Sequence, residues 1–309
     1  MVNIFSRRDL LKLASFAVLG LYPRKSLALE DRIMPPTPEY RDVSHSSIEW
    51  TLVNTGLEFA KIDVHRREEK VDKISVLKID PKYNKLQVFT AYDQLDAPES
   101  QDIQTWQAIT GATALINSAQ YEAKPWGQPC GLAIRRGKNI GPLNDARTRG
   151  MLVAEPKDIG VPQIDLLDFK YDRFDPKTTT YTEGVQHWPI LLDRNGRIRV
   201  NPTDWQANRT VIAKDHEGKI LVFTTEGGFF TLYNFGRFLR ESNKRTDHGF
   251  NVHTAMNLDG GYEAQMMISS KNTNYVTYGQ YETYGTNNNA SVKGARIKLP
   301  TVIGIRPRS

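Results

Sequence analysis

Apolar and polar residues beyond residue 48 mainly alternate, which is typical of β-strands. Residues 73–80 and 86–92 alternate on either side of a proline-containing turn, so they predict a hairpin with one buried face. Residues 208–213 and 219–225 flank an Asp-His-Glu-Gly sequence and predict a second hairpin. Shorter apolar runs predict further strands, at 113–117, 131–134, 186–192, 255–258 and 297–305.

Two segments have a helical pattern. Residues 231–242 place three apolar residues on one face, and residues 103–112 predict a shorter helix. Residues 272–290 are rich in Asn, Thr, Tyr and Gly, which predicts a long loop. Many strands with few helices predict an α+β fold, a single domain built on a mixed, mostly antiparallel sheet with a few helices packed on it.

The N-terminus has the parts of an export signal. The paired Arg7 and Arg8 resemble the twin-arginine motif, and a short apolar run and small residues follow them. Residues 1–28 are therefore predicted to be a twin-arginine-type signal peptide, residues 29–47 an extended leader and residues 48–309 the folded domain. The apolar run is far shorter than the roughly 20 residues of a membrane-spanning helix, so we expect a periplasmic or secreted mature protein without a transmembrane segment. An ordinary secretory signal, an uncleaved anchor and an amphipathic helix are the alternatives.

Most of the net positive charge of the chain lies in the predicted signal peptide. The formal net charge is +6, but residues 1–28 contain five basic residues and one acidic residue, so the remainder carries +2. A nearly neutral domain gives no electrostatic reason to expect a nucleic-acid partner. The single cysteine, Cys130, cannot form an intramolecular disulfide, and its neighbours Pro129 and Gly131 are typical of a turn. We expect Cys130 to be a small buried residue and not a catalytic thiol.

The segment 255–263 carries the most chemical information. Its apolar alternation runs into Asp259, Gly260 and Gly261. Glycines permit backbone angles that other residues avoid and let a ligand approach the main chain. A carboxylate at the end of a buried strand is also where enzymes often place an acid or a metal ligand. Taken by themselves, however, these three residues more often mark a plain hairpin turn, so the residues alone leave both interpretations open.

A strand that ends in Asn-Leu-Asp-Gly-Gly, late in the chain and after a helix, resembles the hallmark of the phosphodiester glycosidase family. Four earlier segments are similar to family segments in the same order: 114–121, 129–137, 186–192 and 208–212. The resemblance implies an exported hydrolase that cleaves the bond between a sugar and a phosphodiester. It also implies a carbohydrate or glycosyl-phosphate substrate and a role in envelope or exopolysaccharide metabolism.

The resemblance implies substrate-binding roles for five residues. Arg209 would hold the phosphodiester, because a planar guanidinium matches two phosphate oxygens; a structural ion pair is the alternative. Asn117 and Asn257 would contact sugar hydroxyls or ligate a cation, with hydrogen bonding to backbone at the strand ends as the alternative. Gly260 and Gly261 would let the substrate approach the main chain.

Asp259 and Glu263 are the predicted catalytic residues, because many sugar-cleaving enzymes place two carboxyl groups across the scissile bond. Asp259 would serve as acid, base or metal ligand. Gln186 and His187 point to opposite faces of a predicted strand, so at most one of them lines the site. Gln186 is predicted to bind substrate, and His187 is kept as a titrating alternative.

No cofactor is required by these residues, although a divalent cation bound by Asp and Asn oxygens is compatible with them. His248 and His253 are five residues apart, whereas a helical zinc pair has a spacing of four, so they are predicted to be solvated loop histidines.

The chain departs from the family after its two glycines. It reads Tyr262-Glu263-Ala264, where the family usually has a small residue followed by serines. Two other functions therefore stay open, a non-catalytic carbohydrate-binding or polysaccharide-assembly protein on the same fold and a metal-dependent phosphodiesterase without sugar specificity.

Overall fold

The computed structural model describes residues 43–118, 120–143, 150–243, 249–284, 288–291 and 296–308. The predicted signal peptide (1–28) and most of the predicted leader (29–47) lie outside these residues, as does His248. The end of the leader range forms β1 (Val43–His45), which pairs with a strand of the domain. Within the described ranges, no helix is long and apolar enough to cross a membrane.

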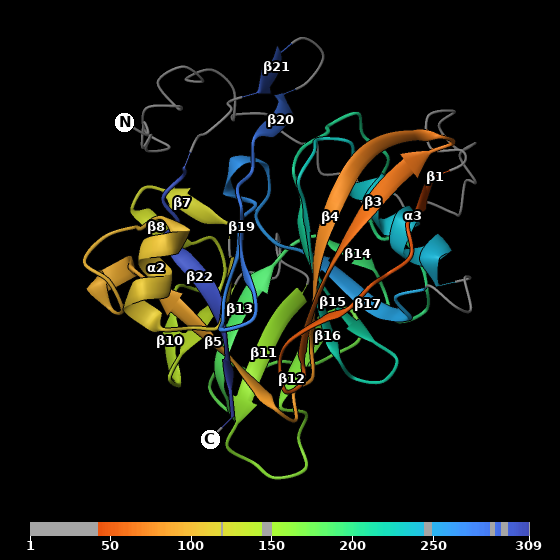
Figure 1. Cartoon of the computed structure of the whole chain (residues 1–309). Coiled ribbons are helices and arrows are strands. Elements are labelled where there is room, and N and C mark those ends of the chain that lie inside the picture. The colour runs from red at the N-terminus through yellow and green to blue at the C-terminus, as the bar shows by residue number, and fades with distance from the viewer. Residues whose placement is uncertain are drawn as a thin grey trace, which may run out of the picture.

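The largest sheet has eight strands, and its pairings are antiparallel (Figure 1). Its spatial order is β1, β3 (Leu57–Arg66), β4 (Glu69–Ile79), β16 (Ile220–Thr225), β15 (Thr210–Asp215), β17 (Val252–Asn257) and β14 (Ile190–Leu192), and β2 (Thr51–Asn54) also pairs with β3. The second predicted hairpin is confirmed, because β15 and β16 pair with Val211 opposite Phe223. On the other side of β15, Asn257 lies opposite Val211, so the end of β17 meets the start of β15.

Two five-stranded sheets and two small hairpins complete the strands. The second sheet is ordered β10 (Lys138–Ile140), β9 (Ala133–Arg135), β13 (Tyr181–His187), β11 (Gly150–Pro156) and β12 (Ile164–Asp168). The third is ordered β19 (Asn274–Thr277), β18 (Met266–Ser269), β6 (Ala114–Asn117), β22 (Thr301–Pro307) and β5 (Asn84–Thr90). The hairpins are β7 (Tyr121–Ala123) with β8 (Trp126–Pro129), and β20 (Tyr281–Tyr284) with β21 (Asn288–Ser291).

The helices follow from local sequence signals. The helix α3 (Leu232–Ser242) begins after Thr231, whose side chain accepts a hydrogen bond from the backbone N–H of Asn234. It packs on β14 and β17 of the large sheet. The helix α2 (Ile103–Thr110) is capped by Asp102 and ends at a left-handed glycine, and it covers the third sheet on the opposite side of the molecule (Figure 1). Two short 3₁₀ segments are η2 (Tyr92–Gln94) and η3 (Gly261–Glu263).

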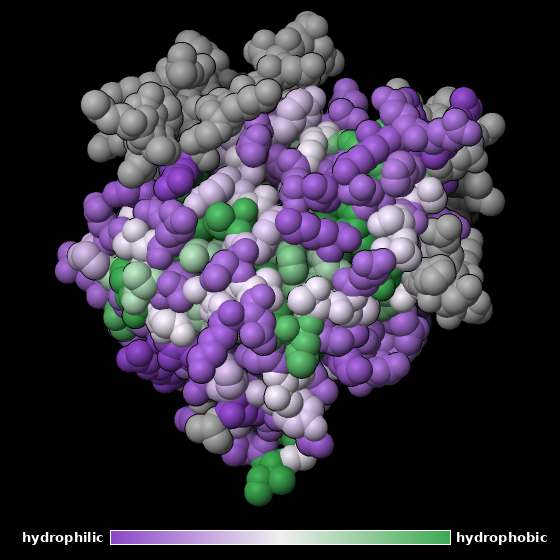
Figure 2. All heavy atoms as spheres, viewed as in Figure 1, coloured by the Kyte–Doolittle hydropathy of each residue, from purple (hydrophilic) through white to green (hydrophobic). Residues whose placement is uncertain are grey.

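The three large sheets share one apolar core. Leu77 of the first sheet, Leu152 of the second and Ile116 of the third belong to the same buried cluster. A second cluster fills the space between the large sheet and α3 and contains several phenylalanines, including Phe223 and Phe235. The face shown in Figure 2 is mainly hydrophilic, with apolar residues in small, separate groups. Most large apolar side chains are therefore inside, as expected for an independently folded domain.

The predicted fold class is confirmed in part. The strands are mostly antiparallel and helices pack on them, but the chain builds several sheets instead of the single mixed sheet that we expected. A strand buried on both faces, such as β4 with Val76 and Leu77 both buried, does not reveal from its own pattern which sheet it joins.

Four local predictions were wrong. The segments 73–80 and 86–92 do not form a hairpin, because β4 pairs with β3 and β16 while β5 pairs with β22 in another sheet. Residues 272–290 are not one loop, since β19 and β20 lie within them. The strand predicted at 186–192 is divided, because Pro189 has no backbone N–H for a ladder. Cys130 is half-buried instead of buried.

Candidate functional site

The Asp-Gly-Gly turn lies where two sheets meet. Asn117 ends β6 of the third sheet, and Thr210 begins β15 of the large sheet. The Thr210 hydroxyl donates a 2.7 Å hydrogen bond to Asn117 Oδ1, which joins the two strand ends directly. Asn257 ends the neighbouring strand β17, and Asp259 follows it two residues later. Strand ends from separate parts of the sequence therefore surround this turn.

Asn117 holds the turn in place. It is fully buried, and its Nδ2 donates to the backbone oxygen of Asp259 at 2.7 Å. Its Oδ1 also accepts from the backbone N–H of Gln265, on the other side of the turn, at 3.1 Å. Sequence analysis predicted that the Asn117 amide contacts a sugar or a cation. In the structure, both its oxygen and its nitrogen form hydrogen bonds with the protein itself. Asn117 positions Asp259 in this structure.

Asp259 is fixed by its own backbone and by its neighbours. Its N–H donates to the Ser118 oxygen at 3.1 Å, and its Oδ1 accepts from the N–H of Gly260 at 3.0 Å. The residue is half-buried. A carboxylate held in this way at the end of a buried strand has a defined orientation, which proton transfer to a substrate requires.

The two glycines leave no space for side chains. Gly261 has a φ of 65°, in the left-handed region that favours glycine. A Cβ at Gly261 would lie 2.5 Å from Oε2 of Glu282, and a Cβ at Gly260 would lie 3.0 Å from the Asn208 oxygen. The same Cβ at Gly260 would lie 3.7 Å from Nη1 of Arg209. The turn therefore packs directly against the arginine that sequence analysis predicted to bind phosphate.

Arg209 is a buried cation without a carboxylate partner in the described part of the chain. Its side chain is held by two carbonyl oxygens, of Trp205 at 2.6 Å from Nη2 and of Phe230 at 3.2 Å from Nε. Burial lowers the pKa of the guanidinium to about 10, and the nearby charge of Glu282 opposes that shift. Arg209 stays charged at neutral pH, with its Nη1 beside Gly260. Because Arg209 forms no ion pair within the described residues and has only the charge of Glu282 nearby, its guanidinium is able to take an anion as a further partner.

Glu263 ends η3, two residues after Gly261. It is 7% exposed, and its Oε1 accepts a 3.0 Å hydrogen bond from the Tyr121 hydroxyl. Tyr262 is buried beside it; burial raises the pKa of the Tyr262 phenol, and the charges of Glu282 and Glu263 act in the same direction. The bulky Tyr262 side chain is therefore packed into the protein at this turn.

Three residues close to the Asp-Gly-Gly turn, Ser118, Gln120 and Asn257, have buried oxygen atoms. Asn257 Nδ2 and Gln120 Nε2 both donate to the Trp188 carbonyl, at 3.2 and 3.1 Å. Among the residues that the structure describes, Asn257 Oδ1, Gln120 Oε1 and Ser118 Oγ have no hydrogen-bond partner. Buried polar atoms of this kind are rare unless a ligand or water completes them. They are suited to contacts with sugar hydroxyls.

A metal centre is less well supported by the same residues. Amide and hydroxyl oxygens do bind hard cations, but tight calcium sites usually include several carboxylates. Within the described ranges, no group of three His, Cys, Asp or Glu residues is placed to hold a metal ion. His253, predicted to be in a loop, lies in β17 with its ring against that of His216, 4.9 Å between centroids.

Gln186 and His187 lie at the end of β13. Gln186 Oε1 accepts from the backbone N–H of Leu132 at 2.7 Å, so this part of its amide joins β13 to the adjacent segment before β9. His187 is fully buried, and burial lowers the pKa of its imidazole to about 3, so the ring is neutral at physiological pH. Gln186 thus has a structural contact in this fold, and its role in substrate binding stays a prediction.

Asn208 is a central residue that sequence analysis did not assign to the site. Its Nδ2 donates to the carbonyl oxygens of Thr225 and Gly227, and its Oδ1 accepts from the N–H groups of Gln280 and Tyr281. Its backbone oxygen accepts from Gly261 at 2.8 Å. Asn208 thus links the Asp-Gly-Gly turn to two loops. In the sequence, only its position directly before Arg209 pointed to a role at the site.

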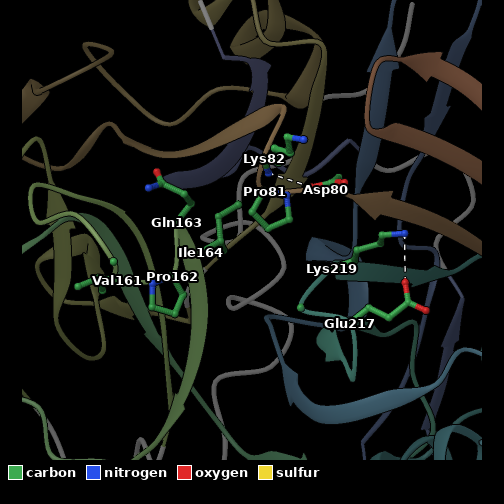
Figure 3. A pocket seen from close by; sticks show the side chains of 11 residues that line it. Asp80, Pro81, Lys82, Val161, Pro162, Gln163, Ile164, Glu217 and Lys219 are labelled. Atoms are coloured by element: carbon green, nitrogen blue, oxygen red, sulfur yellow. Dashed lines mark hydrogen bonds and ion pairs between the residues drawn. The ribbon is translucent and has the colours of Figure 1, made fainter.

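A cavity of about 580 Å³ lies away from these residues (Figure 3). It is lined in part by the β15–β16 turn, at the other end of these strands from Arg209, roughly 20 Å along a six-residue strand. Lys219 forms an ion pair with Glu217 at 3.3 Å, and Asp80 accepts from the backbone N–H of Lys82 at 2.9 Å. These charged groups are already paired, so the cavity does not compete as the site.

Comparisons with known proteins agree with the architecture. The family model described as phosphodiester glycosidase matches residues 110–306, well over half of the 309-residue chain and a range that contains every predicted site residue. The fold is similar to the catalytic domain of zebrafish N-acetylglucosamine-1-phosphodiester alpha-N-acetylglucosaminidase, auto-inhibited by its pro-peptide, with a TM-score of 0.54 and 14% identity over 86% of this chain and 89% of that one. It is also similar to a hypothetical protein from Synechocystis, with a TM-score of 0.53 and 12% identity over 85% of this chain and 64% of that one. A search of curated proteins found no match.

Proposed function

Because this chain belongs to the phosphodiester glycosidase family, we propose that it is a hydrolase that cleaves the bond between a sugar and a phosphodiester. One observation carries the proposal. The buried guanidinium of Arg209, which has no ion pair among the described residues, packs against Gly260, whose backbone N–H donates to the carboxylate of Asp259. A site for an anion and a candidate acid or base thus occupy the same turn.

Arg209 binds the phosphodiester and stabilises the departing group. Water attacks the anomeric carbon, the bond from that carbon to the phosphate oxygen breaks, and its electron pair stays on the phosphate. The second pKa of a phosphate monoester is about 6, so the group leaves as an anion and needs no proton. A cation held in a buried position near the developing charge stabilises this step.

Asp259 receives the proton of the attacking water in this proposal. Glu263, whose carboxylate accepts a hydrogen bond from the Tyr121 hydroxyl, is the second carboxyl group of the turn. In this proposal it polarises the sugar from the side opposite Asp259. The buried oxygens of Ser118, Gln120 and Asn257 accept hydrogen bonds from sugar hydroxyls. These contacts orient the anomeric carbon toward Asp259, and orientation of this kind contributes much of the rate enhancement of enzymes.

We further propose that the protein acts outside the cytoplasm, in envelope or exopolysaccharide metabolism. The paired arginines and short apolar run at the N-terminus support export. A charge of only +2 beyond residue 28 supports a carbohydrate partner over a nucleic acid.

The proposal is tested with methyl phosphodiesters of several sugar 1-phosphates. The set includes N-acetylglucosamine 1-phosphate, because the name of the zebrafish protein specifies that sugar. Release of free sugar and methyl phosphate is followed by NMR, which also gives the anomeric configuration of the product. Asp259→Asn should lower kcat by about 10²- to 10⁴-fold, the usual contribution of a general base.

The control is Asp158→Asn, which removes a carboxylate from an exposed loop and should leave kcat unchanged. Equal thermal unfolding of both variants and the wild type shows that the fold is intact. Full activity of Asp259→Asn excludes this residue from catalysis. Tight sugar binding without turnover in the wild-type protein would instead establish a non-catalytic carbohydrate-binding protein.

A further inference from the structure

A third carboxylate, that of Glu282, lies against the Asp-Gly-Gly turn. A Cβ at Gly261 would lie 2.5 Å from Oε2 of Glu282, so this carboxylate occupies the space that a side chain at Gly261 would need. Glu282 belongs to β20, which packs on η3, the segment that begins at Gly261. Sequence analysis predicted a loop at 272–290, so composition gave no indication that Glu282 lies at the site.

Hydrogen bonds on both sides of Glu282 fix its backbone. The Asn208 N–H donates to the Tyr281 oxygen at 2.9 Å. The Thr283 N–H donates to the Gln206 oxygen at 2.8 Å, and the Thr283 hydroxyl donates to the same oxygen at 2.9 Å. The short segment that precedes the arginine of the site therefore also sets the position of β20.

Arg209 and Glu282 both lie beside the glycines of the turn. A Cβ at Gly260 would lie 3.7 Å from Nη1 of Arg209, whereas the next residue, Gly261, faces Glu282. Burial has the largest effect on the pKa of the Arg209 guanidinium, which it lowers, and the charge of Glu282 raises that pKa. Burial also raises the pKa of the Tyr262 phenol, and the charge of Glu282 raises it further. The carboxylate is thus close enough for its charge to act on an anion bound at Arg209.

The proposed reaction changes the charge of the phosphate group. A phosphodiester carries one negative charge. When its bond to the anomeric carbon breaks, the electron pair stays on the phosphate oxygen, so the monoester product carries two charges above its second pKa of about 6. Coulomb energy is proportional to charge, so Arg209 attracts the product more strongly than the substrate, and a nearby carboxylate repels the product twice as strongly. A carboxylate at this position therefore offsets the extra attraction that would hold the product in place.

We propose that Glu282 makes the site selective for phosphate groups with one negative charge, so that it holds phosphodiesters, discriminates against phosphate monoesters and releases its product. This inference rests on the proposed function for the identity of substrate and product. Asp259 and Glu263 act on the sugar in the proposed reaction, whereas Glu282 determines specificity through its charge alone. Sugar 1-phosphates are monoesters, and the site should reject them for the same reason.

The test measures the binding of two small phosphates by calorimetry at pH 8, where dimethyl phosphate carries one negative charge and methyl phosphate carries two. In the wild type, methyl phosphate should bind no more tightly than dimethyl phosphate. Glu282→Gln removes the charge with little change in size. This variant should bind dimethyl phosphate about 3-fold and methyl phosphate about 10-fold more tightly than the wild type, because doubling the charge of the ligand squares the ratio.

Two further variants separate charge from structure. Glu282→Asp keeps the charge and should keep the preference of the wild type. Glu217→Gln removes an equivalent carboxylate from the β15–β16 turn, at the other end of these strands from the site, and should change neither affinity. Asp204, Asp259 and Glu263 are present in all of these proteins, so their charges cancel in the comparison.

Equal tightening of both ligands in Glu282→Gln, or no tightening of either, would overturn the inference, and so would a wild type that prefers methyl phosphate. In a cleavage assay, the inhibition constant of methyl phosphate should fall about 10-fold in Glu282→Gln. Binding is measured without turnover, so the two proposals fail separately. The predicted affinities in a protein that cleaves no phosphodiester would support this inference and reject the proposed function. Cleavage by the wild type with unchanged affinities in Glu282→Gln would do the reverse.

Discussion

Replacing His187 with glutamine should make the protein less sensitive to acid. His187 ends β13, and its side chain is fully buried. Burial lowers the pKa of its imidazole from the ordinary 6.5 to about 3, so the ring stays neutral in the folded protein over most of the acidic range. The unfolded chain, in contrast, binds a proton at this residue as soon as the pH falls below 6.5.

The sign and size of the effect follow from these two pKa values. Because the pKa is lowered in the folded state, the stability contributed by the neutral ring is present above pH 6.5 and is lost as the pH falls toward 3. At pH 4.5 protonation of the unfolded chain is favoured by about two pKa units, which at roughly 1.4 kcal/mol per unit corresponds to about 2.7 kcal/mol. His187→Gln has no proton to gain and should not show this loss.

Urea unfolding of both proteins at pH 7.5 and pH 4.5 measures the effect. The difference in unfolding free energy between wild type and variant should change by about 2.7 kcal/mol between the two pH values. Asp72 acts in the opposite direction, because burial raises the pKa of its carboxyl to about 6 and its ionisation opposes folding above that pH. Asp72 is present in both proteins and cancels in the comparison. A wild-type-to-variant difference that stays constant within about 0.5 kcal/mol would refute a neutral, buried imidazole.

Two further predictions concern the turn and the N-terminus. Asn117→Ala leaves the Asp259 oxygen, the Thr210 hydroxyl and the Gln265 N–H without their partner, and should lower the free energy of unfolding by about 2–4 kcal/mol in urea titrations. The control Asn139→Ala, which removes one exposed hydrogen bond to Pro176, should cost less than about 1 kcal/mol, and equal losses would contradict the anchoring role of Asn117. If the export signal is cleaved as proposed, N-terminal sequencing of the exported form should begin at or near Leu29, and an intact N-terminus there would exclude cleavage.

Local sequence signals predicted the elements that depend on near neighbours. The helix predicted at 231–242 is observed at 232–242, because its apolar period and the Thr231 cap both act within a few residues. The β15–β16 hairpin was predicted for the same reason, since a short Gly-containing turn fixes which strands pair.

Strand partners from distant parts of the chain could not be predicted in this way. The turn between β4 and β5 is present, and the backbone N–H of Tyr83 donates to the Asp80 oxygen. The two strands nevertheless join different sheets, because β4 pairs with β16 and β5 pairs with β22, partners that lie more than 140 residues away in the sequence. The Asn-, Thr- and Tyr-rich segment forms strands because β18 supplies an edge for β19, which composition does not reveal.

The sequence motif identified candidate site residues, but it did not reveal the hydrogen bonds that hold them in place. Asp259, Gly260 and Arg209 were identified from residue type and order; the structure packs Gly260 against Arg209, and the roles of these residues in binding or catalysis stay predictions. Asn208 and Gln120 lie in segments that resemble the family, but they act through hydrogen bonds to backbone groups that are far apart in the sequence, so their residue types did not reveal these contacts. Residues whose function depends on the chemistry of their own side chain are recognisable from sequence, whereas residues that position others are not.

A second buried arginine in the same molecule supports the proposal that Arg209 binds an anion. Arg135 is 1% exposed and forms ion pairs with Asp96 at 3.0 Å and Glu183 at 2.8 Å, as expected when a buried charge serves the fold alone. Arg209 is 5% exposed, yet it has only carbonyl oxygens as hydrogen-bond acceptors within the described residues. Burial disfavours its charge strongly enough to lower the pKa to about 10, whereas the pKa of Arg135 is raised by its carboxylates. The fold therefore keeps one guanidinium neutralised and holds the other in a fixed orientation without a bound carboxylate. The second arrangement leaves the guanidinium able to bind an anion, and we propose that this anion is the phosphodiester of the substrate.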